Sequence, residues 1–250
     1  MLLAELVCYL DDYLRVRELP DAPEALNGLQ VANAGEVTRI GAAVDLCEAT
    51  VRMAAEQGAD LLVVHHGLFW AGLRPITGPA YGRLAALFAK NIALYSAHLP
   101  LDRHPEVGNN AVLGRQLGIA LRGEFGDYHG QPIGAWGELD LSREALRQKL
   151  AAILGATPRV LPFGTERVQR VGIVTGAGGS MIRQAAAAGL DTYVTGEGAH
   201  HDFFDAEELG VNVYFAGHYA TETVGVKALA EHLSARFRIP WAFLDHPTGL

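Results

Sequence analysis

The feature that most constrains the fold is that this sequence repeats itself. When the chain is shifted by 131 residues, Arg39-Ile40-Gly41 meets Arg170-Val171-Gly172, and the alignment continues without a gap to the end of the next strand. Gly58-Ala59-Asp60 meets Gly189-Leu190-Asp191 under the same shift. Further along the shift becomes 120, and ALYSAH at 93–98 meets VYFAGH at 213–218. The repeat predicts a duplicated structural unit.

Apolar runs alternate with helical patterns through both halves of the chain. Strands are predicted at 39–45, 61–65, 92–97, near 133–140, and at 171–176, 192–195, 211–216 and 240–244. Helices are predicted at 1–16, 47–57, about 80–90, 108–117, 143–154, 179–188, 199–208 and 220–236. This alternation is typical of layered α/β proteins with largely parallel sheets.

The change of shift indicates an extra segment in the first half. The stretch 67–82, GLFWAGLRPITGPAYG, has no counterpart in the second half. Because it is punctuated by glycine and proline, it is predicted to be a loop.

Composition excludes several classes of protein. Of the 250 residues 50% are hydrophobic and 19% charged, which is enough for a packed core. The net charge of −8 disfavours non-specific binding of nucleic acid, although a local basic patch stays possible. The two cysteines, Cys8 and Cys47, imply no disulfide framework. No signal peptide or membrane span is found, so we expect a cytoplasmic protein.

Imidazoles and carboxylates follow the predicted strands at equivalent places. They are Asp45, His65, His66, His98 and Asp102 in the first half, and Glu197, His218 and Glu222 in the second. Ligands in open α/β sheets bind beyond the carboxyl ends of strands. Imidazole with carboxylate suits Zn, Mn, Fe, Co or Ni, and two adjacent histidines at a strand end can each bind a different ion. A single histidine at a strand end is more often structural, so the whole set carries this prediction.

Four motifs in the sequence resemble a known family over essentially the whole chain. They are NGLQV (27–31), VVHHG (63–67), SAHLPLD (96–102) and AGHYATE (216–222). The family is that of the dinuclear-metal-centre hexameric proteins, which are like NGG-interacting factor three and are often catalogued as GTP cyclohydrolase I type 2 homologues.

The resemblance implies a metal site, a fold and an assembly. The implied ligands of two divalent ions are His65, His66, Asp102, His218 and Glu222, with Glu222 as the bridge. The implied fold is two similar, intertwined α/β domains of three-layer type, which we assign to 1–125 plus about 225–250 and to 126–224. The implied assembly is a toroidal homohexamer. Two departures from the family pattern, Gly67 after the histidine pair and Leu99-Pro100 before the aspartate, remove no ligand but bear on substrate identity.

The function stays open between two classes at this point. The first is a metal-dependent hydrolase acting on a nucleotide, with GTP ring opening as the reaction named for the family. His98 and Glu197 are then the candidate catalytic residues for proton transfer, although His98 also suits a supporting or structural role. The alternative is a non-enzymatic, metal-dependent regulatory toroid that binds single-stranded nucleic acid or a protein.

Some further polar residues have no assigned role in either class. Asp45, His200 and His201 fit an active site or a solvated turn equally. The glycine-rich stretch TGAGGS (175–180) fits a tight turn better than a phosphate loop, because it lacks the lysine of such loops.

Overall fold

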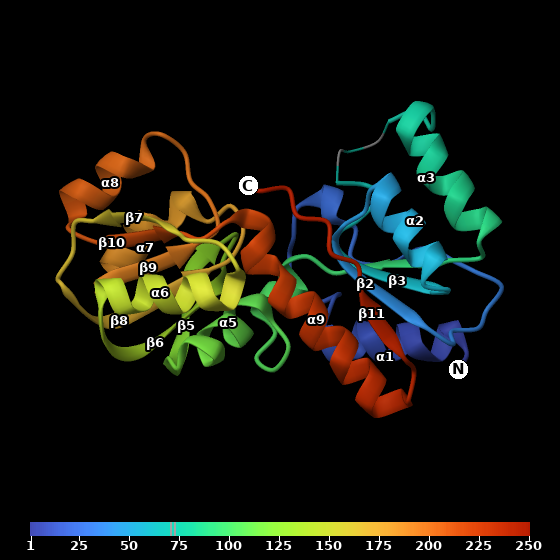
Figure 1. Ribbon diagram of the computed structural model, residues 1–250, viewed down its shortest axis with the longest axis horizontal. Coiled ribbons are helices and arrows are strands. Elements are labelled where there is room, and N and C mark those ends of the chain that lie inside the picture. Colours follow the sequence, from blue (N-terminus) through green and yellow to red (C-terminus); the bar gives the residue numbers. More distant parts are fainter. Residues whose placement is uncertain (71, 73) are drawn as a thin grey trace. The chain divides into compact units, whose positions relative to one another are not determined.

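The computed structural model describes residues 1–70, 72 and 74–250, and its chain divides into two units (Figure 1). Unit 1 comprises Met1–Leu101 and Val226–His246, and unit 2 comprises Asp102–Gly225 and Pro247–Leu250. This division places α5 (Asn109–Leu117) and β5 (Ala120–Tyr128), which pack on β6 (Gln131–Ser142), in unit 2, whereas residues 1–125 were assigned to the first domain from the sequence. Each unit is a sheet with helices on both faces, so the predicted duplicated α/β fold is confirmed.

Unit 1 is built on a five-stranded sheet. Its strand order is β1 (Gly28–Val31), β4 (Ala93–Ser96), β3 (Leu61–His66), β2 (Ile40–Asp45) and β11 (Trp241–Phe243). The four strands β4, β3, β2 and β11 are parallel, and β1 pairs antiparallel with β4. In Figure 1, α2 (Glu48–Glu56) and α3 (Gly78–Ala89) cover one face, and α1 (Leu3–Leu14) covers the other together with the later turns of α9 (His218–Phe237).

The core of unit 1 follows from its hydrophobic patterns. All six residues of β3 are buried, as expected of a strand between two parallel neighbours with helices on both faces. Helix α1 buries one stripe, formed by Leu3, Leu6, Leu10 and Leu14, at the three- and four-residue spacing of a helix face. The polar groups described below lie at the carboxyl ends of strands β2, β3 and β4 or directly after them.

Unit 2 contains a six-stranded sheet. Its strand order is β5, β6, β8 (Arg167–Val174), β9 (Thr192–Thr195), β10 (Asn212–Phe215) and β7 (Arg159–Pro162). The central strands β8, β9 and β10 are parallel, and the pairs β5–β6, β6–β8 and β10–β7 are antiparallel. In Figure 1, α7 (Ile182–Ala187) and α8 (Asp202–Leu209) lie over one face, and α5 and α6 (Arg143–Leu154) lie over the other.

Strand register supports the duplication that the sequence predicted. Ile40 pairs with Leu61 in unit 1, and Val171 pairs with Thr192 in unit 2. The second pair is the first pair shifted by 131 residues, so the two units share pairing as well as sequence. The sheets are less parallel than predicted, because the antiparallel strands β1, β5 and β7 were not predicted from the sequence. The short helix α4 (Leu99–Arg103) was not predicted either.

The predicted loop at 67–82 is shorter than expected, because α3 already begins at Gly78. Within it, positions 71 and 73 lie outside the described residues. Among the helices that the structure describes, none is both long and apolar enough to cross a membrane.

Candidate metal centre

His65 and His66 end the buried strand β3 of unit 1. The two residues are 0% and 7% exposed, and their ring centroids lie 4.7 Å apart with the planes tilted by 47°. The ring of His98, which follows β4, lies 4.9 Å from that of His65 and 5.6 Å from that of His66. Because β3 and β4 are parallel neighbours, the ends of both strands deliver imidazoles to the same edge of the sheet.

Each of these three rings is held by an acceptor at Nδ1. The three contacts, each 2.8 Å long, are His65 to the carbonyl oxygen of Ala97, His66 to Oδ1 of Asp45, and His98 to Oδ1 of Asp21. An acceptor at Nδ1 keeps the ring proton there, so the lone pair of a neutral ring lies on Nε2. Metal-binding histidines are almost always held in this way.

The three imidazoles form a donor group that fits a metal ion. One ring nitrogen from each of His65, His66 and His98 lies within 4.8 Å of those of the other two. Neutral imidazole binds Zn, Cu, Fe and Ni well, so the donor chemistry of the group agrees with a transition metal. The indole of Trp70 packs against the rings of His66 and His98 at centroid distances of 4.8 and 4.4 Å.

The NGLQV motif supports the chain at and next to these histidines. Asn27 accepts a hydrogen bond from the backbone N–H of His98 (2.7 Å) and donates one to Asp21 (2.8 Å). Gln30 accepts one from the backbone N–H of Leu68 (2.7 Å). A Cβ at position 67 would clash with the side-chain amide of Gln30, so Gly67 leaves the space that this glutamine occupies.

Asp21 is a supporting residue that the sequence did not single out. Its carboxylate also accepts a hydrogen bond from the backbone N–H of Leu99. Burial raises the pKa of Asp21, but the hydrogen bond and charge of His98 and the amide of Asn27 outweigh it, and the net pKa is lowered. Asp21 therefore stays ionised and fixes the orientation of the His98 ring.

In unit 2, a buried aspartate is held by two donors. Asp102 is 7% exposed, and its Oδ1 accepts hydrogen bonds from Nδ2 of Asn109 (2.8 Å) and Oγ1 of Thr175 (3.2 Å). The side-chain carbonyl oxygen of Asn109 in turn accepts the backbone N–H of Gly225 at 2.7 Å. Asn109 is a second supporting residue that sequence patterns missed, because a polar residue in the first turn of a helix usually faces water.

The first turns of α9 carry a histidine and a glutamate, which are further candidate metal ligands of unit 2. Nε2 of His218 lies 3.2 Å from Oε1 of Glu222, one helical turn later, and Nδ1 of His218 lies 2.9 Å from Oε1 of Glu197. Glu222 is 2% exposed and lies against Gly176, where a Cβ would clash with its Oε1. Gly176 therefore leaves room for the buried carboxylate.

The two glutamates change the acidity of His218. Burial lowers the pKa of this imidazole, but the hydrogen bonds and charges of Glu222 and Glu197 outweigh it and raise the pKa to about 9. Without metal, the stability that this ionisation contributes is therefore fully present below the ordinary pKa near 6.5 and is lost as the pH rises through about 9.

We expect metal binding to release a proton from His218. At pH 7.5 the metal-free imidazole is mainly protonated, and a protonated ring has no lone pair for a metal. Adding Zn²⁺ to weakly buffered, metal-free protein should release about one proton per chain from this ring, measured with a pH indicator dye. Glu197→Gln should release less, because His218 then has a lower pKa. Equal proton release from both proteins would contradict this assignment.

The other residues named in the sequence analysis, His200, His201 and the stretch 175–180, lie on the surface or in a turn. His200 and His201 are exposed, His200 beside the ring of Phe204 and His201 with Nε2 3.5 Å from Oδ1 of Asp202. In the 175–180 stretch, the N–H groups of Gly176 and Gly178 donate to threonine hydroxyls, and that of Gly179 donates to the carbonyl oxygen of Glu197. These donors serve a tight turn rather than a phosphate.

Comparison with known proteins places the chain among relatives that match nearly its full length. The family model described as Duf34/NIF3 (NGG1p interacting factor 3) matches residues 1–248. A Deinococcus radiodurans protein named "GTP cyclohydrolase 1 type 2 homolog" is 47% identical over 98% of this chain and 94% of that protein. One of the same name from Archaeoglobus fulgidus is 43% identical over all of both chains.

Solved structures agree with the match. The crystal structure of TTHA1606 from Thermus thermophilus has a TM-score of 0.91 and 46% identity, with full coverage of both chains. Reduced HcgD from Methanocaldococcus jannaschii has a TM-score of 0.85 and 27% identity, with 98% of each chain covered. The architecture described above is therefore shared with experimentally determined proteins.

Proposed function

Because the chain belongs to the DUF34/NIF3 family, we propose that it binds two divalent metal ions and hydrolyses a nucleotide with their help. The proposed ligands are those that the motifs imply: His65, His66, Asp102, His218 and Glu222, with Glu222 bridging the ions. The observation that carries the proposal is that each histidine of this set is held at Nδ1 by a carboxylate or a carbonyl oxygen. Such partners orient imidazoles for metal binding and raise their basicity.

The donor set fits divalent transition metals. It combines imidazole nitrogens with carboxylate oxygens, and its members are buried or half-buried. We propose Zn, Mn, Fe, Co or Ni as the ion, because this donor chemistry suits all five. When bound, two such ions lower the pKa of water and stabilise the charge that develops during hydrolysis.

The remaining polar residues of the two units have proposed roles in proton transfer. His98, fixed at Nδ1 by the ionised Asp21, presents Nε2 as a proton acceptor or donor. Glu197 accepts from Nδ1 of His218 and is partly exposed, so its second oxygen can exchange protons with a substrate. Both residues can supply general acid–base catalysis beside the metal ligands of their own units.

The names of the relatives suggest the substrate class and the reaction. Because they are called GTP cyclohydrolase 1 type 2 homologs, we propose a nucleotide such as GTP and hydrolysis of a carbon–nitrogen bond in its ring. We also propose a cytoplasmic homohexamer, as the motif resemblance implies. Sedimentation velocity should then report six chain masses, and a stable monomer or dimer would overturn that assembly.

Turnover of GTP tests the proposed activity. Protein reconstituted separately with Mn²⁺, Fe²⁺, Co²⁺, Ni²⁺ or Zn²⁺ should convert GTP to a ring-opened product with at least one metal, as followed by liquid chromatography and mass spectrometry. A chelator should abolish the reaction, since the ions supply the electrostatic stabilisation. Bound metal with no turnover of GTP, ATP or their monophosphates would overturn the hydrolase proposal and favour the metal-dependent binding protein.

A further inference from the structure

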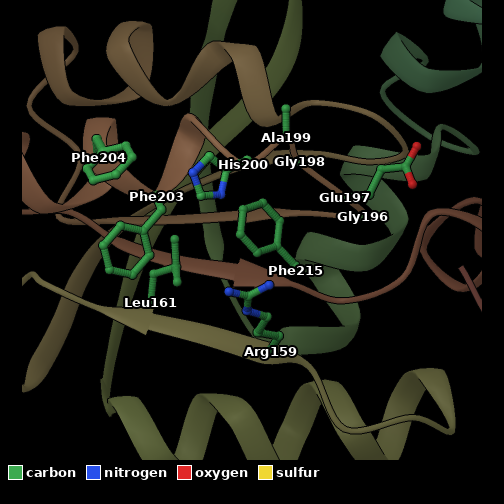
Figure 2. Close-up of a pocket in the computed structure, with 10 residues that line it drawn as sticks. All are labelled: Arg159, Leu161, Gly196, Glu197, Gly198, Ala199, His200, Phe203, Phe204 and Phe215. Carbon is green, nitrogen blue, oxygen red and sulfur yellow. The ribbon is translucent and has the colours of Figure 1, made fainter.

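A pocket of about 430 Å³ in unit 2 lies beside Glu197 and has no role in the mechanism above. It is bordered by strands β7 and β10, helix α8 and the segment that follows β9. Its lining residues are Arg159, Leu161, Phe203, Phe204, Phe215 and the segment 196–200 (Figure 2). The pocket therefore lies at the carboxyl ends of β9 and β10, where open α/β sheets bind their ligands.

Strand pairing places the cationic side chain of Arg159 beside the aromatic side chain of Phe215. Arg159 pairs directly with Phe215 across the antiparallel β7–β10 ladder, so both side chains extend from the same face of the sheet. Leu161, two residues further along β7, extends from that face as well. In Figure 2 the Arg159 guanidinium lies beside the Phe215 ring, and the His200 ring lies on the other side of Phe215.

The pocket is mainly apolar and aromatic. Phe203 and Phe204 of α8 form one side, with centroids 5.5 Å apart in an edge-to-face arrangement. Phe204 is 47% exposed, so part of its ring is accessible from solvent. Such surfaces bind flat rings, because aromatic side chains stack on any π-face with little dependence on its identity.

Arg159 supplies the one cationic side chain of the lining. Among the described residues, no carboxylate lies within ion-pair distance of its guanidinium, whereas several other exposed arginines of unit 2 are paired. A guanidinium binds carboxylate or phosphate through two parallel hydrogen bonds. An exposed, unpaired arginine beside three phenylalanines thus indicates a ligand that is both planar and anionic.

We propose that this pocket binds the planar heteroaromatic ring of an anionic ligand of nucleoside monophosphate size. The rings of Phe203, Phe204 and Phe215 pack against the heterocycle, and Arg159 binds its anionic group. A volume of about 430 Å³ is within the range of small-molecule sites and admits one such molecule. If this ligand is also the substrate, that role rests on the proposed function, whereas the binding itself does not.

Glu197 connects this pocket with the candidate metal centre. It is one of the lining residues of the pocket, and its Oε1 lies 2.9 Å from Nδ1 of His218. In Figure 2 its carboxylate lies at the opposite end of the view from Phe203 and Phe204. A ring held by the phenylalanines is therefore placed at one end of a pocket whose lining also includes Glu197, the residue that contacts His218.

Isothermal titration calorimetry with GMP tests this assignment. The full-length protein, as purified and again with excess chelator, is titrated with GMP, guanosine and inorganic phosphate. Phe204→Ala should weaken GMP binding about tenfold, the usual cost of losing one stacking partner. Arg159→Gln should weaken GMP about tenfold and leave guanosine unchanged, because the lost contact is to the anion.

Two matched variants control for general effects. Phe88→Ala removes another exposed phenylalanine (65% exposed), and Arg52→Gln removes another exposed arginine, both in unit 1. Both should bind GMP like the wild type. The proposal is overturned if no GMP binding is detected, if inorganic phosphate binds as tightly as GMP, or if the control variants lose as much affinity as the pocket variants.

The outcomes also separate this inference from the proposed function. GMP binding that persists with chelator and falls in the pocket variants supports the pocket, even if the protein holds no metal and turns over no nucleotide. Metal-dependent turnover of GTP with unchanged GMP affinity in both pocket variants overturns the pocket and leaves the hydrolase proposal standing.

Discussion

Replacement of Glu222 by alanine is expected to lower the bound metal from about two ions per chain to one or fewer. Glu222 is 2% exposed, and its carboxylate lies against Gly176 and is 3.2 Å from Nε2 of His218. If it bridges the ions, its removal costs more affinity than the ~10–100-fold typical of losing an outer-shell partner. Elemental analysis of tag-free wild type and variant, purified side by side, measures the effect.

Two further variants make the result specific. Glu231→Ala changes an exposed glutamate on the same helix α9, so it removes the same charge away from the donor pair and should retain the metal of the wild type. Glu222→Gln keeps the volume of the side chain and loses only the charge, so it separates loss of a ligand from loss of packing. Wild-type metal content in both Glu222 variants would show that this residue is no ligand.

Substitution of Gly196 by alanine is expected to destabilise the protein strongly. A Cβ at this position would lie 2.6 Å from the carbonyl oxygen of Gly176, 2.7 Å from Cα of His218 and 2.9 Å from Oγ1 of Thr221. Two of these atoms belong to backbone, and the N–H of Gly196 itself donates to the Gly176 carbonyl oxygen at 2.9 Å. Moving either backbone segment costs free energy, so the overpacking should lower the free energy of unfolding by about 1–3 kcal/mol or more.

Thermal unfolding followed by circular dichroism measures this cost. For a chain of this length, each kcal/mol lowers Tm by roughly 2–4 °C. Gly82→Ala is the matched control, because its Cβ would meet only the flexible carboxylate end of Glu48 at 3.0 Å, in the middle of α3. There the higher helix propensity of alanine should leave Tm unchanged or raise it. Equal Tm values for Gly196→Ala and the wild type would contradict the steric argument.

The sequence alone predicted the parts of the fold that depend on local patterns. Buried strands such as β2, β3 and β9 are short apolar runs between turn signals, and the 131-residue repeat reappears as the same register in both units. The antiparallel edge strands β1 and β7 were missed, because each is defined by its pairing with a distant strand, β4 or β10. Their stability comes from that partner rather than from their own composition.

The residue types of the candidate metal centre could also be predicted from the sequence. His65 and His66 end an apolar strand. His218 and Glu222 are one helical turn apart at the start of α9, shortly after strand β10. Both pairs therefore follow the pattern of ligand-binding residues at the carboxyl ends of strands. The residues that hold them were not predictable, because Asp21 meets His98 across 77 positions and Asn109 meets Gly225 across 116. No local signal marks such contacts.

What the sequence by itself determined is therefore the duplicated α/β plan and the chemistry of the donors, since both follow from short-range periodicity and residue type. The tertiary structure decided which ring nitrogen of each histidine faces the site and where Arg159 joins Phe203 and Phe215 in one pocket. These features depend on hydrogen bonds and strand register between segments far apart in the chain. Only the folded protein brings those segments within contact distance.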